Sequence, residues 1–112
     1  MVIVVDLTNG IVTLVAPDDT DHFAVRVSAP AGATGSSSAG GLARILAATG
    51  VGRLDAGGDA FVDPEAVRFR AAGQVDDRWD DRFAAMCRFA TTKGWTADDG
   101  AIRAHVEWPA GA

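Results

Sequence analysis

Three polar side chains on one predicted strand have the types and spacing needed for acid–base chemistry. His105 and Glu107 lie two residues apart in the segment 101–108, and Arg103 lies two residues before His105, so a strand would place all three on one face. A carboxylate beside an imidazole can orient the ring and raise its basicity, as a general base requires. His22 would lie near them if its own strand pairs with this one. We take His105, Glu107 and His22 as candidate catalytic residues, although any half-solvated strand shows the same alternation.

Two histidines and a carboxylate also raise the question of a metal site. Zinc ligands are usually recognisable by short sequence spacings, and His22 and His105 lie far apart in the chain. The single cysteine, Cys87, excludes an internal disulfide and a cysteine-rich zinc site. The sequence therefore predicts neither a metal nor another cofactor.

A segment rich in Gly, Ser and Ala, residues 29–41, is the first candidate for binding an anion. Backbone N–H groups between a strand and a helix can hold phosphate, and Ser36, Ser37 and Ser38 would add hydroxyl groups. The segment matches neither the Walker pattern nor Gly-x-Gly-x-x-Gly, and it contains no Lys or Arg. A flexible connector is the interpretation that the composition favours.

Three tryptophans form the second group of candidate ligand-binding residues. Trp79, Trp95 and Trp108 can together close one end of a core between a helix and the sheet. Any tryptophan that is left uncovered would instead provide an aromatic contact surface or one wall of an apolar pocket. We therefore take Trp95 and Trp108, together with Arg103, as candidate ligand-binding residues.

The remaining reactive side chains have structural interpretations. The acidic pairs at 76–77 and 80–81 lie near the start of a predicted helix, where they can cap it and interact favourably with its dipole. Cys87 falls on or beside the apolar stripe of that helix and is expected to be a small core residue. No Gly-x-Ser-x-Gly or His-Glu-x-x-His signature is present, and this absence favours a non-enzymatic role.

The N-terminal part of the chain predicts three strands. Asn9-Gly10 is a favoured two-residue turn, and it predicts a hairpin over residues 2–16 in which Val5 faces Leu14. Strict alternation over residues 22–28 predicts a third strand. Because consecutive strands are usually neighbours, we expect a three-stranded antiparallel meander over residues 2–28.

Helices and one strand are predicted for the rest of the chain. Good helix formers predict a helix over residues 38–49, and residues 51–58 look irregular. Residues 64–72 have a helix start signal but also an alternation typical of a strand, and the helix is preferred. An amphipathic helix over residues 77–93 and a strand over 101–108 follow. The predicted fold is a single α+β domain, residues 1–112, whose antiparallel sheet is covered on one face by helices.

Composition narrows the possible partners. The net charge is −5 and the ten basic residues are interleaved with acidic ones, so nucleic-acid binding is not expected. No apolar run approaches the ~18–20 residues of a membrane span, and the first residues lack the pattern of a signal peptide. The sequence therefore predicts an acidic cytoplasmic protein with no membrane contact.

Two functions remain compatible with these observations. The first is protein–protein interaction, including self-association, which the absence of catalytic signatures favours. The alternative is a small enzyme or small-ligand-binding domain. Its pocket would lie between the helix at 77–93 and the sheet, lined by His105 and Glu107.

Overall fold

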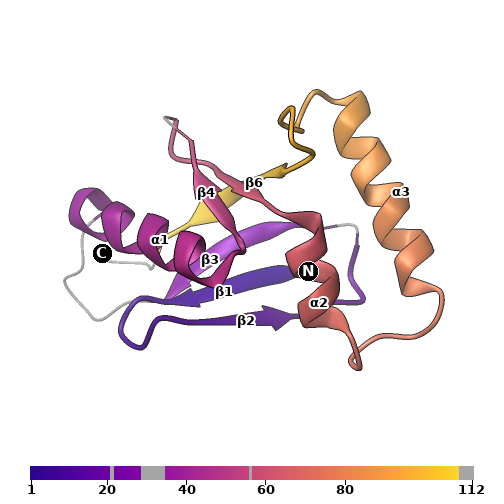
Figure 1. Ribbon diagram of the computed structural model, residues 1–112, viewed down its shortest axis with the longest axis horizontal. Helices are drawn as coiled ribbons and strands as arrows, with labels where there is room; N and C mark the ends of the chain where they lie inside the picture. The colour runs from indigo at the N-terminus through magenta and orange to yellow at the C-terminus, as the bar shows by residue number, and fades with distance from the viewer. Residues whose placement is uncertain (21, 29–34, 56, 109–112) are drawn as a thin grey trace.

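The chain forms one mixed sheet with helices beside it, as a computed structural model shows (Figure 1). The structure describes residues 1–20, 22–28, 35–55 and 57–108, and only the backbone of 35–39. Within these ranges the elements are β1 (Val2–Asp6), β2 (Ile11–Val15), β3 (Ala24–Ser28), α1 (Gly35–Thr49), β4 (Gly52–Leu54), β5 (Ala60–Val62), α2 (Pro64–Ala71), α3 (Trp79–Thr92) and β6 (Ile102–Glu107). The strands are arranged in the order β2-β1-β3-β6-β5-β4. The α+β class is therefore confirmed.

The first two strands form the predicted hairpin in a different register. Val5 pairs with Val12, whereas the predicted register paired it with Leu14. The loop therefore spans residues 7–10 and not Asn9-Gly10 alone. The cause is Asp6, whose carboxylate accepts hydrogen bonds from the backbone N–H groups two and three residues later at 2.8 and 3.3 Å. Because the shift is two residues, the two faces of the hairpin keep the same side chains.

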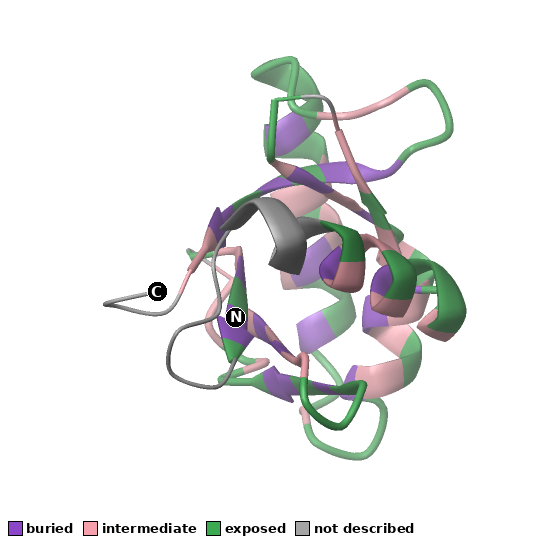
Figure 2. Ribbon diagram, turned by 90° about the vertical axis from the view of Figure 1, so that its left-hand side faces the viewer, coloured by how far each residue is buried: buried purple, intermediate pink, exposed green. Residues whose placement is uncertain are grey.

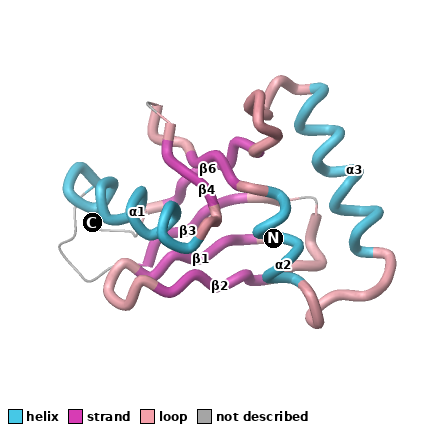
Figure 3. Tube along the Cα trace, viewed as in Figure 1, coloured by secondary structure: helices cyan, strands magenta, loops and turns pink. Residues whose placement is uncertain are grey.

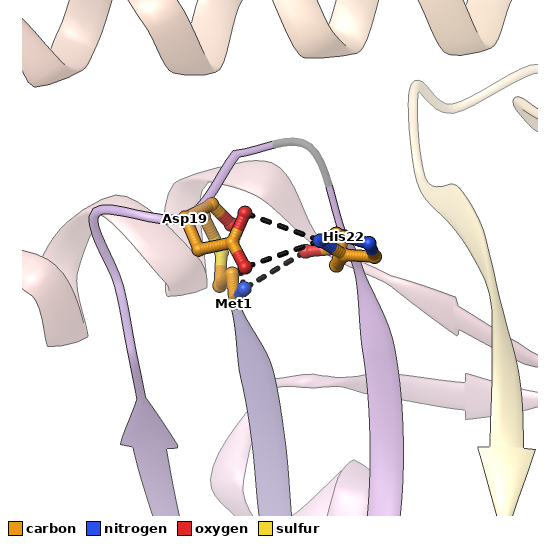
Figure 4. A network of polar contacts seen from close by, with 3 residues as sticks. All are labelled: Met1, Asp19 and His22. Atoms are coloured by element: carbon orange, nitrogen blue, oxygen red, sulfur yellow. Dashed lines mark hydrogen bonds and ion pairs between the residues drawn. The ribbon is translucent and has the colours of Figure 1, made fainter.

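The third strand lies beside β1 and not beside β2, so the predicted antiparallel meander is wrong. β3 pairs with β1 in parallel, which makes the sheet mixed. Composition does not explain this choice, because β1 and β2 each contain one polar residue among five. The connection from β2 to β3 passes the start of β1. There the Met1 amino group donates hydrogen bonds to the carbonyl oxygens of Asp19 and His22, at 2.6 and 2.8 Å (Figure 4).

A second hairpin, β4–β5, was not predicted: β4 lies in the segment 51–58 that the sequence predicts to be irregular, and β5 follows that segment. Each of its strands has three residues, which is too short for alternation to be recognised. Asp55 holds the turn, because its carboxylate accepts hydrogen bonds from the N–H groups of Gly57 and Asp59 at 2.8 and 2.9 Å. The C-terminal strand β6 consequently lies between β3 and β5, parallel to the first and antiparallel to the second.

Two of the predicted helices begin and end close to the expected residues. In α2 the Asp63 carboxylate accepts a hydrogen bond from the N–H of Glu65 at 3.0 Å, and Pro64 is the first residue. This cap decides between the two predictions for residues 64–72 in favour of the helix. α3 ends before Gly94, which has a left-handed φ of 74°, as the sequence predicts.

The helix α1 begins earlier than predicted. It starts at Gly35, so the part of the segment 29–41 from residue 35 onward is helical and not a flexible loop. Residues 29–34 lie outside the described residues. Ser and Gly are poor helix formers, but Leu42 and Leu46 of the same helix are completely buried. Packing of these leucines stabilises the helix more than the weak propensity of its first turn opposes it.

The helices α1 and α2 pack against one face of the sheet and enclose the core. Their buried residues Leu42, Leu46, Val67 and Ala71 join one cluster with Ile3, Val5, Val25, Val27, Ala104 and Val106 of the strands. Figure 2 shows buried segments, in purple, on both the helices and the strands. Alternate residues of the same strands, such as Thr13, Arg26 and His105, are exposed on the opposite face. The third helix, α3, stands at one end of the molecule, away from α1 (Figures 1 and 3). No helix among the described residues has the length and apolar character needed to cross a membrane.

Candidate functional site

The helix α3 is attached to the rest of the molecule at both of its ends. At its start, Trp79 is buried, stacks on Phe83 with ring centroids 4.8 Å apart, and donates its indole N–H to the carbonyl oxygen of Pro17. Beyond its end, the backbone N–H of Arg103 in β6 donates a hydrogen bond to the carbonyl oxygen of Trp95 at 2.7 Å. Between these two attachments a cleft separates the helix from the sheet.

This cleft, which we call the α3 cleft, has a volume of about 1120 Å³. That is slightly above the usual range for small-molecule sites, roughly 300–1,000 Å³. Its walls come from α3 and the segment after it, from the connection between β2 and β3, from the start of β5, and from β6. The lining residues are Thr20, His22, Phe23, Ala24, Asp59, Arg82, Ala85, Met86, Phe89, Ala90, Trp95, Ile102, Arg103, His105 and Glu107.

One wall of the α3 cleft is apolar. Ala85, Met86 and Phe89 face it from α3, and Trp95 extends it beyond the helix. The Phe89 and Trp95 rings meet edge to face, with centroids 5.9 Å apart. Both are unusually open to solvent for aromatic residues, with 54% of Phe89 and 40% of Trp95 exposed. An apolar ligand that covered these rings would remove them from water, which is favourable.

The opposite wall is polar and is provided mainly by β6. Arg103, His105 and Glu107 lie on one face of this strand, as the alternation predicts, and all three line the cleft. The predicted pairing of His105 with Glu107 is not observed. The Nδ1 atom of His105 lies 3.9 Å from a carboxylate oxygen of Asp59, whereas Glu107 is bonded to Nε of Arg26 at 3.3 Å.

His22 also lines the cleft, at the end where the chain enters β3. Its Nδ1 atom is 3.2 Å from a carboxylate oxygen of Asp19 (Figure 4). The side chains of His22 and His105 are 81% and 77% exposed. Such open imidazoles keep most of their hydration, so the cleft supplies polar contacts without enclosing a reactive group. Among the described residues, no three His, Cys, Asp or Glu side chains converge as metal ligands would.

The other predicted binding residues lie away from the α3 cleft. Trp108 is partly buried and packs against the core. Residues 36–38 belong to the first turns of α1, at the other end of the molecule from α3, and their side chains lie outside what the structure describes (Figure 1). Of the three tryptophans, Trp79 is a core residue, and Trp95 is the one that lines the cleft.

Sequence reasoning missed several residues of the cleft. Asp59 lies in the unpredicted β4–β5 hairpin, so its position opposite His105 had no sequence signal. Phe89 did carry one, because it falls outside the buried arc that Trp79 and Phe83 mark on α3. A large aromatic residue off the buried face of an amphipathic helix is a signal for a contact surface.

The lone cysteine of α3 lies on the side of the helix that packs against the core. Burial raises the pKa of the Cys87 thiol above its ordinary value of 9.0, and the nearby guanidinium of Arg68 opposes this only in part. The thiolate is therefore scarce at neutral pH, and Cys87 is a poor nucleophile. Because the folded state holds the proton more tightly, the stability that this group contributes is lost as the pH rises above about 9.

Comparison of the chain with protein-family models, with curated proteins and with solved structures gave no match.

Proposed function

We propose that this chain is a binding module whose ligand occupies the α3 cleft. The observation that supports the proposal most directly is the contrast between the two walls of the cleft. One wall presents Phe89, Trp95 and Met86, and the other presents Arg103 and His105. A ligand with an apolar body and a polar end would satisfy both walls, and few precisely placed polar groups beside an apolar surface are typical of ligand sites.

The way α3 is held also supports a binding role. The helix is fixed to the connection after β2 by Trp79 and to β6 through the segment after Gly94. One side of it packs against the core through Phe83 and Cys87, and the side that carries Ala85 and Phe89 lines the cleft. An amphipathic helix normally buries its apolar residues against its own core. Here Phe89 remains more than half exposed, which leaves it available to a ligand.

The proposal can be tested with a neutral fluorescent reporter of apolar sites, N-phenyl-1-naphthylamine. We expect its fluorescence to rise on binding to the folded protein. Replacing Phe89 with alanine should weaken binding about tenfold, because an aromatic contact contributes roughly 0.5–1.5 kcal/mol beyond the area it buries. The matched control is Phe69→Ala, which removes an equally large ring that is 82% exposed on α2, outside the cleft. Equal binding by the two variants would contradict the proposal.

A second function, self-association, is favoured by the outer strand β2. This edge strand has no charged residue, and Ile11 and Val15 are 56% and 43% exposed on the face opposite the helices. Edge strands usually carry charges, prolines or bulges that prevent pairing with another chain. On the same face the ion pair Arg26–Glu107 balances charge locally. A second copy would therefore meet little repulsion there despite the net charge of −5.

This second proposal predicts a dimer that depends on β2. Light scattering coupled to size-exclusion chromatography should show a mass that rises with concentration for the unmodified protein. Ile11→Lys should shift the protein to monomer, because it places a charge on the pairing face. Phe69→Lys, at another exposed apolar position, should leave the mass unchanged. A monomer at all concentrations before any substitution would refute self-association.

A further inference from the structure

We propose that the ligand of the α3 cleft is a small amphipathic carboxylate and that Arg103 is the residue that pairs with its charge. This inference rests on the binding function proposed above, and it adds the chemical class of the ligand. It is argued from the unpaired charge of Arg103, from the position of this residue between the two walls, and from the chemistry of its guanidinium group.

Arg103 differs from the other charged residues of the cleft in its ion pairing. Arg82 lies 3.5 Å from Asp76, Asp59 approaches His105 at 3.9 Å, and Glu107 is bonded to Arg26. His22 is bonded to Asp19. Among the described residues, Arg103 is the charged side chain of the cleft that makes no ion pair or hydrogen bond. A cation that is left unpaired in a protein of net charge −5 gives this part of the cleft a local positive charge.

The position of Arg103 places this charge at the junction of the two walls. Its backbone N–H is bonded to the carbonyl oxygen of Trp95, so strand β6 and the aromatic wall meet at this residue. Its side chain shares the outer face of the strand with His105, two residues on. A carboxylate at Arg103 would therefore leave the apolar part of the same molecule within reach of Trp95 and Phe89.

Guanidinium chemistry favours a carboxylate over a neutral polar group. The planar guanidinium of Arg103 can donate two parallel N–H bonds to the two oxygens of a carboxylate. The acidic neighbour Glu107 is already paired with Arg26 and would repel an anion less than a free carboxylate would. A cationic head group would meet Arg103 itself and would be disfavoured.

Three amphiphiles with the same twelve-carbon tail test the inference by isothermal titration calorimetry, each below its aggregation concentration. They are dodecanoate, dodecanol and dodecyltrimethylammonium. We expect dodecanoate to bind about tenfold more tightly than dodecanol, as one charged hydrogen-bonded pair allows. The ammonium compound should bind the most weakly. Arg103→Gln should remove the advantage of dodecanoate without changing the affinity for dodecanol. The matched control Arg88→Gln, on α3 but outside the cleft, should retain it.

The possible outcomes separate this inference from the function it rests on. If dodecanol binds and depends on Phe89 but dodecanoate has no advantage, the carboxylate assignment is wrong and the binding function stands. If the advantage persists in Arg103→Gln, the residue assigned to the charge is wrong. If none of the three compounds binds and N-phenyl-1-naphthylamine also fails to bind, both proposals are overturned.

Discussion

Replacing Phe83 with alanine is expected to lower the free energy of unfolding by about 3–5 kcal/mol, the usual cost of deleting a buried phenylalanine ring. Phe83 is completely buried, stacks on Trp79 at 4.8 Å, and lies 5.1 Å from the guanidinium carbon of Arg68, which covers its ring. The substitution would leave a cavity and remove both contacts. Small domains have only about 5–15 kcal/mol of stability, so much of the total would be lost.

Thermal and urea unfolding followed by circular dichroism measure this effect. At about 4 °C per kcal/mol, the melting temperature should fall by roughly 12–20 °C. Phe69→Ala is the control, because its ring is 82% exposed on α2 and its loss should change stability by less than about 0.5 kcal/mol. Similar melting temperatures for the two variants would show that Phe83 is not part of the core. Because Phe83 also anchors α3, its loss should weaken reporter binding in the α3 cleft.

Local sequence signals predicted the helices and the strands with clear alternation. The α2 cap at Asp63-Pro64, the apolar arc of α3 and the alternation in β3 and β6 all lie within a few residues of the elements they specify. Where prediction failed, a side chain or a distant segment decided the result. The Asp6 carboxylate lengthened the first turn, and Asp55 stabilised a hairpin with strands too short to show a pattern.

The sheet order could not be read from neighbouring residues at all. The structure places β1 between β2 and β3, although β1 and β2 each contain one polar residue among five, so composition does not distinguish them. Local alternation fixes which side of a strand faces the core, but it does not say which strand lies next to it. The prediction therefore used the general preference for consecutive strands to pair, and this preference placed β3 beside the wrong strand.

The polar face of the candidate site and Trp95 of its apolar wall were predictable, but the rest of that wall was not. The outward face of β6 followed from alternation, so Arg103, His105 and Glu107 were identified together. The partners of these residues were not, because Arg26 and Asp59 reach them across strands β3 and β5. The cleft itself is a consequence of how α3 is held at its two ends, and no spacing within the chain encodes that arrangement.

The second large effect is expected from Gly52→Ala in β4. A Cβ atom at this position would lie 2.0 Å from the carbonyl oxygen of Phe61 and 3.1 Å from Cα of Val62. Both contacts are backbone atoms of the paired strand β5, which cannot move aside as a flexible side chain would. The two strands would have to separate, at a cost of about 3 kcal/mol, the upper part of the range for overpacked sites.

Gly40→Ala makes the same chemical change and is expected to raise stability where Gly52→Ala lowers it. Gly40 lies inside α1, has no atom within 4 Å of the added methyl group, and has an ordinary negative φ. Alanine should stabilise this helix by about 0.5–1 kcal/mol, because it restricts the unfolded chain and favours the helix. Urea unfolding of the two variants should therefore shift the midpoint in opposite directions. If Gly52→Ala were as stable as the unmodified protein, β4 could not lie against β5 as described. Asp59 follows the turn of the β4–β5 hairpin and lines the α3 cleft. Because Gly52→Ala would displace this hairpin, it should also disturb the polar wall of the cleft.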